Sequence, residues 1–249
     1  MPFVDSEGAA LDRVALVYRG GVLFQVVDPF VWIDPRTGEH IPVPAHDLAS
    51  PAVHPGNATD LASVPPFLWG LTASSGRQTL PAILHDHLSV DADLDPPSSL
   101  DRRRRADDAF RIALVEAGVT DLRATTMWTA VGLQRSLRYE GARGLLLVAQ
   151  VVIGVLVIVA AVVLAALLHP LWLLLALVPA PFALAWGRDA ALVLAGSFLG
   201  ALYSPLVVGA AVASGVEYGV AVLIWLVRGR RGAMPRPGPA IRGGPVERG

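Results

Sequence analysis

The chain has 249 residues, of which 53% are hydrophobic and only 16% are charged. Soluble globular domains carry about 25% charged residues, so this composition indicates that part of the chain lies in a membrane. The formal net charge of −1 gives no global electrostatic attraction for nucleic acid. The absence of cysteine excludes disulfides, thiolate zinc sites and cysteine nucleophiles.

The first 60 residues predict β structure. Short runs of β-branched and aromatic residues are separated by turn signals, and Gly20-Gly21 marks the first hairpin. A second pair of strands flanks the turn at residues 34–38, and a loop rich in proline follows. The expected strands are 13–18, 22–27, 30–34 and about 40–43, and the expected loop is 44–58.

Four helices are expected after the strands. Ser98 or Ser99 suits the N-cap of the third helix, and Thr120 suits that of the fourth. The expected ranges are 65–71, 78–90, about 99–117 and 121–140. Strands followed by helices predict an α+β soluble domain over residues 1–140, and its last helix runs toward the apolar part of the chain.

Residues 141–228 predict an all-α transmembrane region of about four helices. A spanning helix needs roughly 20 apolar residues, and Gly144–Leu168 provides them without a charge. His169-Pro170 ends this run, because proline cannot continue helical hydrogen bonding. Ala190–Val227 is too long for one crossing, so it is expected to fold back near Ser204-Pro205 or Ser214-Gly215. The expected crossings are about 144–168, 170–187, 190–205 and 210–227.

Arginines flank the apolar region at both ends, and such clusters favour the cytoplasmic side. They are Arg135, Arg138 and Arg143 before it and Arg228, Arg230 and Arg231 after it. Both the N-terminal domain and the C-terminal tail are therefore expected in the cytoplasm, which requires an even number of crossings. Residues 229–249 are basic and rich in proline and glycine, and they predict a disordered tail. Glu217 is a lone carboxylate within an expected span, which makes it either a functional group or a side chain that reaches the interface.

Helical spacing separates two neighbouring carboxylates in the third helix. Asp107 lies on the flank of the apolar face, whereas Asp108 points nearly opposite. A carboxylate directed at a core needs a partner, and His85 in the second helix is a candidate. A His–Asp pair across two helices can orient an imidazole for proton transfer or metal binding, although a His-Asp dipeptide is more often an ordinary polar turn.

Three motifs occur in order along the soluble domain: Thr59-Asp60-Leu61-Ala62-Ser63-Val64-Pro65, Ala82-Ile83-Leu84-His85-Asp86-His87-Leu88 and Arg105-Ala106-Asp107-Asp108-Ala109-Phe110. Together they resemble the DUF1353 family, which is best known from phage and prophage genomes. The resemblance covers about residues 13–135. The sequence departs from the family pattern at His87 and Ser89, where an aromatic residue and a tyrosine are commoner. The family is of unknown function, so the resemblance implies no activity.

The order of His-Asp followed by an inward Asp is similar to the layout of secreted phospholipases A2. That similarity implies His85 as the base that activates water, Asp86 as a metal ligand and Asp107 as the group that orients His85. Asp60 is a possible further metal ligand. The cation implied is calcium, which binds hard oxygen ligands. The glycine-rich loop and the disulfides of those enzymes are absent from this chain.

Two hypotheses follow for function. The first is a membrane-tethered, metal-assisted hydrolase that acts on a lipid or cell-envelope substrate. The second is a non-catalytic membrane interaction protein of phage origin, in which Asp60, His85 and Asp107 form a structural polar network and Asp107 neutralises an arginine such as Arg105. Nucleic-acid binding through Arg102–Arg105 is disfavoured, because these arginines cover every face of a helix and acidic neighbours offset them. The lipid bilayer is the expected partner, and no protein partner is indicated.

Overall fold

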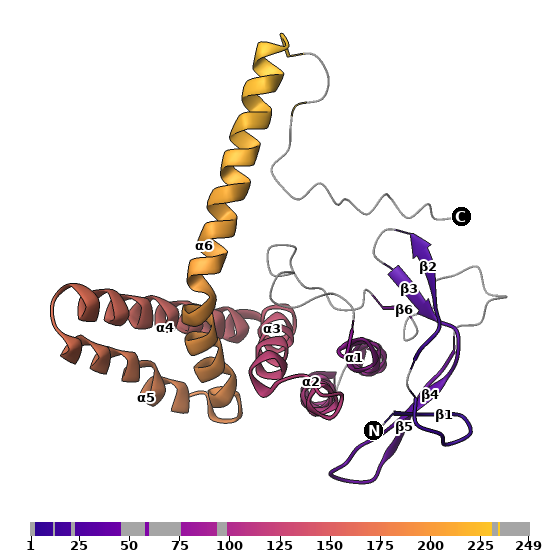
Figure 1. Cartoon of the computed structure of the whole chain (residues 1–249). Coiled ribbons are helices and arrows are strands. Elements are labelled where there is room, and N and C mark those ends of the chain that lie inside the picture. Colours follow the sequence, from indigo (N-terminus) through magenta and orange to yellow (C-terminus); the bar gives the residue numbers. More distant parts are fainter. Residues whose placement is uncertain are drawn as a thin grey trace.

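The structure is a computed structural model that describes residues 3–11, 13–20, 23–45, 58–59, 76–93, 99–230 and 234. Short strands come first and helices follow, and a long helical region ends the described chain (Figure 1). The predicted fold class, an α+β domain followed by an all-α apolar region, is confirmed.

The strands form two three-stranded antiparallel sheets, ordered β1-β4-β5 and β2-β3-β6. Both predicted hairpins, β2–β3 and β4–β5, are present. The short strands β1 and β6 were not expected, since each pairs with a strand distant in sequence. The strands are β1 (Phe3–Asp5), β2 (Leu16–Gly20), β3 (Leu23–Val26), β4 (Phe30–Ile33), β5 (His40–Val43) and β6 (Ala58–Thr59).

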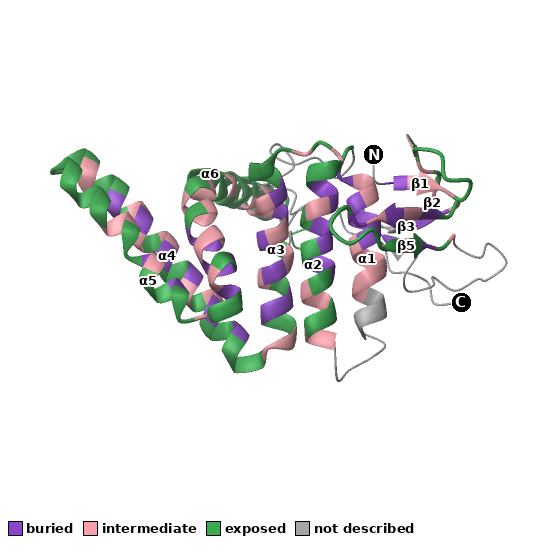
Figure 2. Ribbon diagram, turned by 90° about the horizontal axis from the view of Figure 1, so that it is seen from below, coloured by how far each residue is buried: buried purple, intermediate pink, exposed green. Residues whose placement is uncertain are grey.

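Alternation along β4 buries Phe30 and Trp32 on one face of their sheet. These rings join a core cluster with Val43 of the same sheet and with Ile83 and Leu84 of α1 (Thr79–Asp93). The sheets therefore pack on α1, and α1 forms the layer between the strands and the other helices of the domain (Figure 2).

Helix α2 (Ser99–Glu116) lies beside α1, and α3 (Asp121–Tyr139) lies on the other side of α2, as Figure 2 shows. Three of the four helices expected in the soluble domain are thus confirmed, and the expected helix at 65–71 lies outside the described residues. Gly118 ends α2 with a positive φ of 79°. Thr120 occupies the N-cap of α3 as expected, but its side chain makes no capping hydrogen bond.

The apolar region begins directly after α3 with α4 (Gly141–Leu167). The chain then returns along α4 through the 3₁₀ helix η3 (Pro170–Leu177) and α5 (Pro179–Leu184), and the 3₁₀ turn η4 (Gly187–Asp189) leads into α6 (Ala190–Val227). Among the described residues, two helical segments are long and apolar enough to cross a membrane, Gly141–Leu167 and Gly187–Val227.

The expected reversal near Ser204-Pro205 or Ser214-Gly215 is wrong, because α6 is one continuous helix of 38 residues. Pro205 has no N–H to bond the carbonyl of Ala201, four residues earlier. The Ser204 hydroxyl donates to that carbonyl instead, at 2.8 Å. This bond satisfies the carbonyl that the proline leaves open, so the helix continues.

Glycines allow the apolar helices to approach one another closely. A Cβ added at Gly154 of α4 would lie 2.2 Å from the Ser197 hydroxyl of α6, and one added at Gly196 would lie 2.9 Å from Val151. The tightest position is Gly144, where a Cβ would lie 1.8 Å from the backbone oxygen of Ser136. The absence of a side chain at Gly144 therefore sets how closely α4 passes α3.

We expect Gly144→Ala to lower the free energy of unfolding by about 2 kcal/mol, because the added methyl group would push the backbones of α3 and α4 apart. Thermal unfolding of the full chain in detergent measures the effect. Gly209→Ala is the matched control, since a Cβ at Gly209 meets nothing within 4 Å and alanine favours a helix. Equal melting temperatures for the two variants would contradict the close helix contact.

Candidate functional site

Helices α1 and α2 bring His85 and Asp107 into contact, as the sequence predicts. His85 Nε2 lies 3.0 Å from Asp107 Oδ1, and their side chains are 15% and 4% exposed. Asp107 is buried and Asp108 is exposed, so the predicted orientation of both carboxylates is confirmed. The ring of Phe110 packs 4.9 Å from the imidazole. The pair therefore lies within the packed interior between the two helices.

Carboxylates on two sides of His85 stabilise its charged form. Asp86 Oδ1 lies 3.8 Å from Nδ1, on the side of the ring opposite to the Asp107 contact. Burial lowers the pKa of His85, but the hydrogen bonds and charges of Asp107 and Asp86 outweigh it and raise the pKa to about 9. His85 is therefore an imidazolium at neutral pH, a form that donates protons to hydrogen bonds and cannot accept one.

The second oxygen of Asp107 is also occupied. Arg135 Nη1 of α3 donates to Asp107 Oδ2, and the Arg135 side chain is only 6% exposed. The expected pairing of Asp107 with an arginine is confirmed, but the arginine is Arg135 and not the suggested Arg105. Arg105 is two residues away on the same helix and therefore projects to another side, where it is exposed.

Asp189 extends these contacts into the apolar region. Its side chain is 4% exposed, and its Oδ1 lies 3.4 Å from Arg135 Nη2. Its Oδ2 accepts from Arg104 Nη2 at 2.9 Å and from Arg143 Nη2 at 3.2 Å. Asp189 is thus contacted by one arginine from each of α2, α3 and α4.

Glu140, at the junction of α3 and α4, is the remaining anion. Its side chain is 2% exposed and has Arg104 Nη2 at 3.5 Å and Arg143 Nε at 3.7 Å. The Ser136 hydroxyl donates to it at 3.2 Å. We call this set the domain–helix network; it consists of His85, Arg104, Asp107, Arg135, Glu140, Arg143 and Asp189. With Asp86 at its edge, four cations face four anions.

Sequence reasoning missed Asp189 as a site residue, although one signal marked it. Gly187-Arg188-Asp189 is the polar interruption between two long apolar stretches, and a charged group in such a place needs a partner. The pattern could not name that partner, because the three arginines lie 46 to 85 residues earlier in the chain.

The structure does not test the predicted pair of metal ligands, Asp86 and Asp60, because only Asp86 lies among the described residues. Asp86 is one-third exposed, and its Oδ1 lies 3.8 Å from His85 Nδ1. Asp60 lies outside the described residues. Across those that are described, no group of three or more His, Asp or Glu side chains could hold a metal ion. Glu217 is exposed on α6 and does not belong to the domain–helix network.

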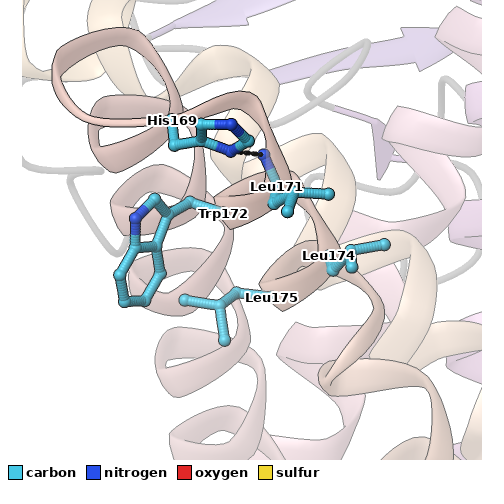
Figure 3. Close-up of a pocket in the computed structure, with 5 residues that line it drawn as sticks. All are labelled: His169, Leu171, Trp172, Leu174 and Leu175. Carbon is cyan, nitrogen blue, oxygen red and sulfur yellow. Dashed lines mark hydrogen bonds between the residues drawn. The ribbon is translucent and has the colours of Figure 1, made fainter.

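Two apolar hollows lie in the helical region, away from the network. The larger, of about 410 Å³, lies at the turn between α4 and η3 and is lined by His169, Leu171, Trp172, Leu174 and Leu175 (Figure 3). There the Leu171 N–H donates to His169 Nδ1 at 3.2 Å, which fixes the imidazole at the start of η3. The smaller hollow, of about 120 Å³, lies between α4 and α5. Neither is lined by a residue of the network.

Comparison with known families shows which part of the network lies in a family domain. Residues 24–131 match the sequence model of the family described as "Protein of unknown function (DUF1353)". These residues form a DUF1353 domain. The predicted resemblance is confirmed, and no curated protein and no solved structure matches the chain significantly. The DUF1353 domain supplies His85, Arg104 and Asp107, whereas the other four residues of the network lie beyond it. The network therefore crosses the boundary of the family domain.

Proposed function

We propose that this chain is a non-catalytic membrane-anchored protein in which the domain–helix network fixes the DUF1353 domain to the apolar helices. The observation that carries the proposal is the position of Asp107. One of its oxygens contacts His85 inside the DUF1353 domain, and the other accepts from Arg135, which in turn reaches Asp189 at the start of α6.

The energetics of buried charge support a structural role. Charges removed from water are tolerated when they are paired, and loss of one partner leaves the other uncompensated. Asp107, Arg135, Glu140 and Asp189 all have side chains less than 10% exposed, and each has an opposite charge within 4.0 Å. The contacts join α2, α3, α4 and the start of α6, so the network would specify how the domain sits on the helices.

The apolar helices supply the membrane part of the proposal. Leucine, valine and isoleucine side chains remain largely exposed along α4 and α6, which suits lipid rather than water. The protein would hold its DUF1353 domain beside the bilayer and present the surface of that domain to partners. The arginines before α4 favour the cytoplasmic face for the domain.

A metal-assisted hydrolase is the second candidate, and the 3.0 Å contact between His85 and Asp107 favours it. In that mechanism His85 would lose its proton to become the base, Asp107 would orient it and Asp86 would bind a cation such as calcium. The raised pKa of His85 opposes this role at neutral pH, because the imidazole already holds the proton that a base must accept.

Thermal unfolding of the full chain in detergent separates the two candidates. The structural proposal predicts that His85→Ala and Asp107→Ala both lower the melting temperature, with about 2 kcal/mol lost for His85→Ala because a buried charge partner of Asp107 disappears. Glu116→Ala is the control, since Glu116 is an exposed carboxylate of the same domain.

The hydrolase candidate predicts a different pattern. Both variants would melt like the wild type, phospholipid cleavage by the wild type would require calcium, and His85→Ala would abolish that cleavage. Calcium would also raise the melting temperature of the wild type but not that of Asp86→Ala. That combination of results would replace the structural proposal with the enzymatic one.

A further inference from the structure

The two halves of α6 have different surroundings. Residues 190–203 include four buried positions, Leu192, Val193, Gly196 and Ser197. From Leu206 to Val227 no residue is buried, and Figure 1 shows this half of α6 extending away from the other helices. The first half thus belongs to the folded core, and the second half has no protein around it among the described residues.

The first half of α6 crosses α3 of the soluble domain at a steep angle, as Figures 1 and 2 show together. Leu192 packs over Gly132, where an added Cβ would lie 2.8 Å from it. Eleven residues later along α6, the Tyr203 hydroxyl lies 3.4 Å from Thr126 Oγ1. These contacts with α3 lie between Leu192 and Tyr203, so α6 leaves the domain at about Pro205.

The length of α6 requires such a division. Its 38 residues extend about 57 Å at 1.5 Å per residue, nearly twice the roughly 30 Å of the bilayer hydrocarbon. The 22 residues from Leu206 to Val227 extend about 33 Å, which matches one crossing. Of the two halves of α6, only the second therefore has both the length and the exposed surface of a membrane-spanning helix.

Residues of the kinds found at membrane interfaces flank this half. Tyr203 precedes it and Trp225 lies near its end, where aromatic rings favour the headgroup level. Arg228 and Arg230 follow, and the Arg230 guanidinium lies 5.9 Å from the Trp225 ring. Glu217 is the one ionisable carboxylate between them, and eleven Leu, Ile and Val residues in the same segment favour insertion by more than that carboxylate opposes it.

The α4–α5 hairpin returns the chain to the place where it left the domain. Arg143 lies in the first turn of α4, and Asp189 immediately precedes α6. Their side chains are 3.2 Å apart, so the start of α4 and the start of α6 lie together beside the domain. Whatever depth the hairpin reaches in the membrane, it makes an even number of crossings.

We propose that Leu206–Val227 is the membrane-spanning anchor of this protein, and that it places Arg228 on the side of the bilayer opposite to the DUF1353 domain. One crossing by α6 is added to an even number from the hairpin, so the total is odd. The inference rests on the proposed membrane anchoring and departs from the even number that the flanking arginines favour.

Cysteine accessibility in whole cells tests this topology, and the chain offers a clean background because it has no cysteine. The full-length variants are Glu116→Cys in the DUF1353 domain, Met234→Cys after α6 and Ser214→Cys within the proposed span. An impermeant maleimide applied to intact spheroplasts should label only one of the first two variants, and permeabilised cells should show both labelled. Ser214→Cys should stay unlabelled until detergent dissolves the membrane.

Two results would overturn the inference. The first is that Glu116→Cys and Met234→Cys are both labelled, or both unlabelled, in intact spheroplasts. The second is that Ser214→Cys reacts as fast as Met234→Cys in permeabilised cells. Alkaline carbonate extraction distinguishes this failure from failure of the proposed anchoring. If the protein stays in the membrane pellet and the two variants are labelled alike, only the proposed crossing by α6 is refuted. If the protein is released into the supernatant, the proposed membrane anchoring is refuted as well.

Discussion

Replacing Asp189 by alanine should lower the free energy of unfolding by about 3–5 kcal/mol, the range expected when one partner of a buried ion pair is removed. The three arginines around Asp189 would remain in place without its charge. Arg135 has a side chain only 6% exposed, and Arg104 has one only 14% exposed, so water cannot readily replace the lost carboxylate. Asp107 and Glu140 would then be the remaining anions of the network that face these three arginines.

The measurement is thermal and denaturant unfolding of the full chain in detergent, with Glu116→Ala as the control for loss of an exposed carboxylate. Surface substitutions of that kind usually change stability by less than about 0.5 kcal/mol. Asp189→Asn adds a second comparison, because the amide keeps the shape and one acceptor oxygen but loses the charge. If Asp189→Ala melts like Glu116→Ala, the contacts among Arg104, Arg135, Arg143 and Asp189 contribute nothing to holding the domain on the helices.

Local pattern was sufficient to predict most elements of the DUF1353 domain. Alternating apolar residues and turn glycines identified the hairpins β2–β3 and β4–β5, because strand periodicity and turn geometry are properties of neighbouring residues. Helical periodicity also separated Asp107 from Asp108, since a step of about 100° per residue places adjacent side chains on different faces. The contact between Asp107 and His85 followed from the need of a buried carboxylate for a partner.

The rest of the network depends on how distant helices dock. Arg105 was the nearest basic residue in sequence, but Arg135 pairs with Asp107 because α3 packs on α2 and carries that arginine inward. Asp189 joins from 54 residues further along the chain, after the α4–α5 hairpin has turned back. Spacing within one helix contains no information about these approaches, which are fixed only by the tertiary packing.

The continuity of α6 shows how a local rule can mislead. The apolar stretch is too long for one crossing, so a reversal was expected near Ser204-Pro205, where proline leaves one helical carbonyl unbonded, or near Ser214-Gly215. The residue that made the motif resemble a turn, Ser204, is also the one whose hydroxyl bonds the carbonyl of Ala201. In an apolar setting that bond favours continuing the helix over exposing backbone groups to lipid.

Raising the pH from 6.5 to about 9.5 should destabilise the wild-type protein by up to about 3 kcal/mol through His85 alone. The folded-state pKa of about 9 lies above the ordinary value of 6.5, so the folded protein holds this proton more tightly than the unfolded chain does. The resulting stabilisation is fully present below pH 6.5 and is lost as the pH rises through 9. Deprotonation removes the positive partner of Asp107 and Asp86 and leaves both carboxylates facing a neutral ring.

His85→Gln, which cannot titrate, should show a flatter pH dependence, and the difference between the two melting curves isolates the contribution of His85. The five other histidines and the α-amino group are the same in both proteins, so their titration cancels in this difference, and the chain has neither cysteine nor lysine. Parallel curves for wild type and His85→Gln would mean that His85 is not a folded-state imidazolium. The strongest objection to the hydrolase candidate would then disappear, because a neutral His85 held by Asp107 could accept a proton.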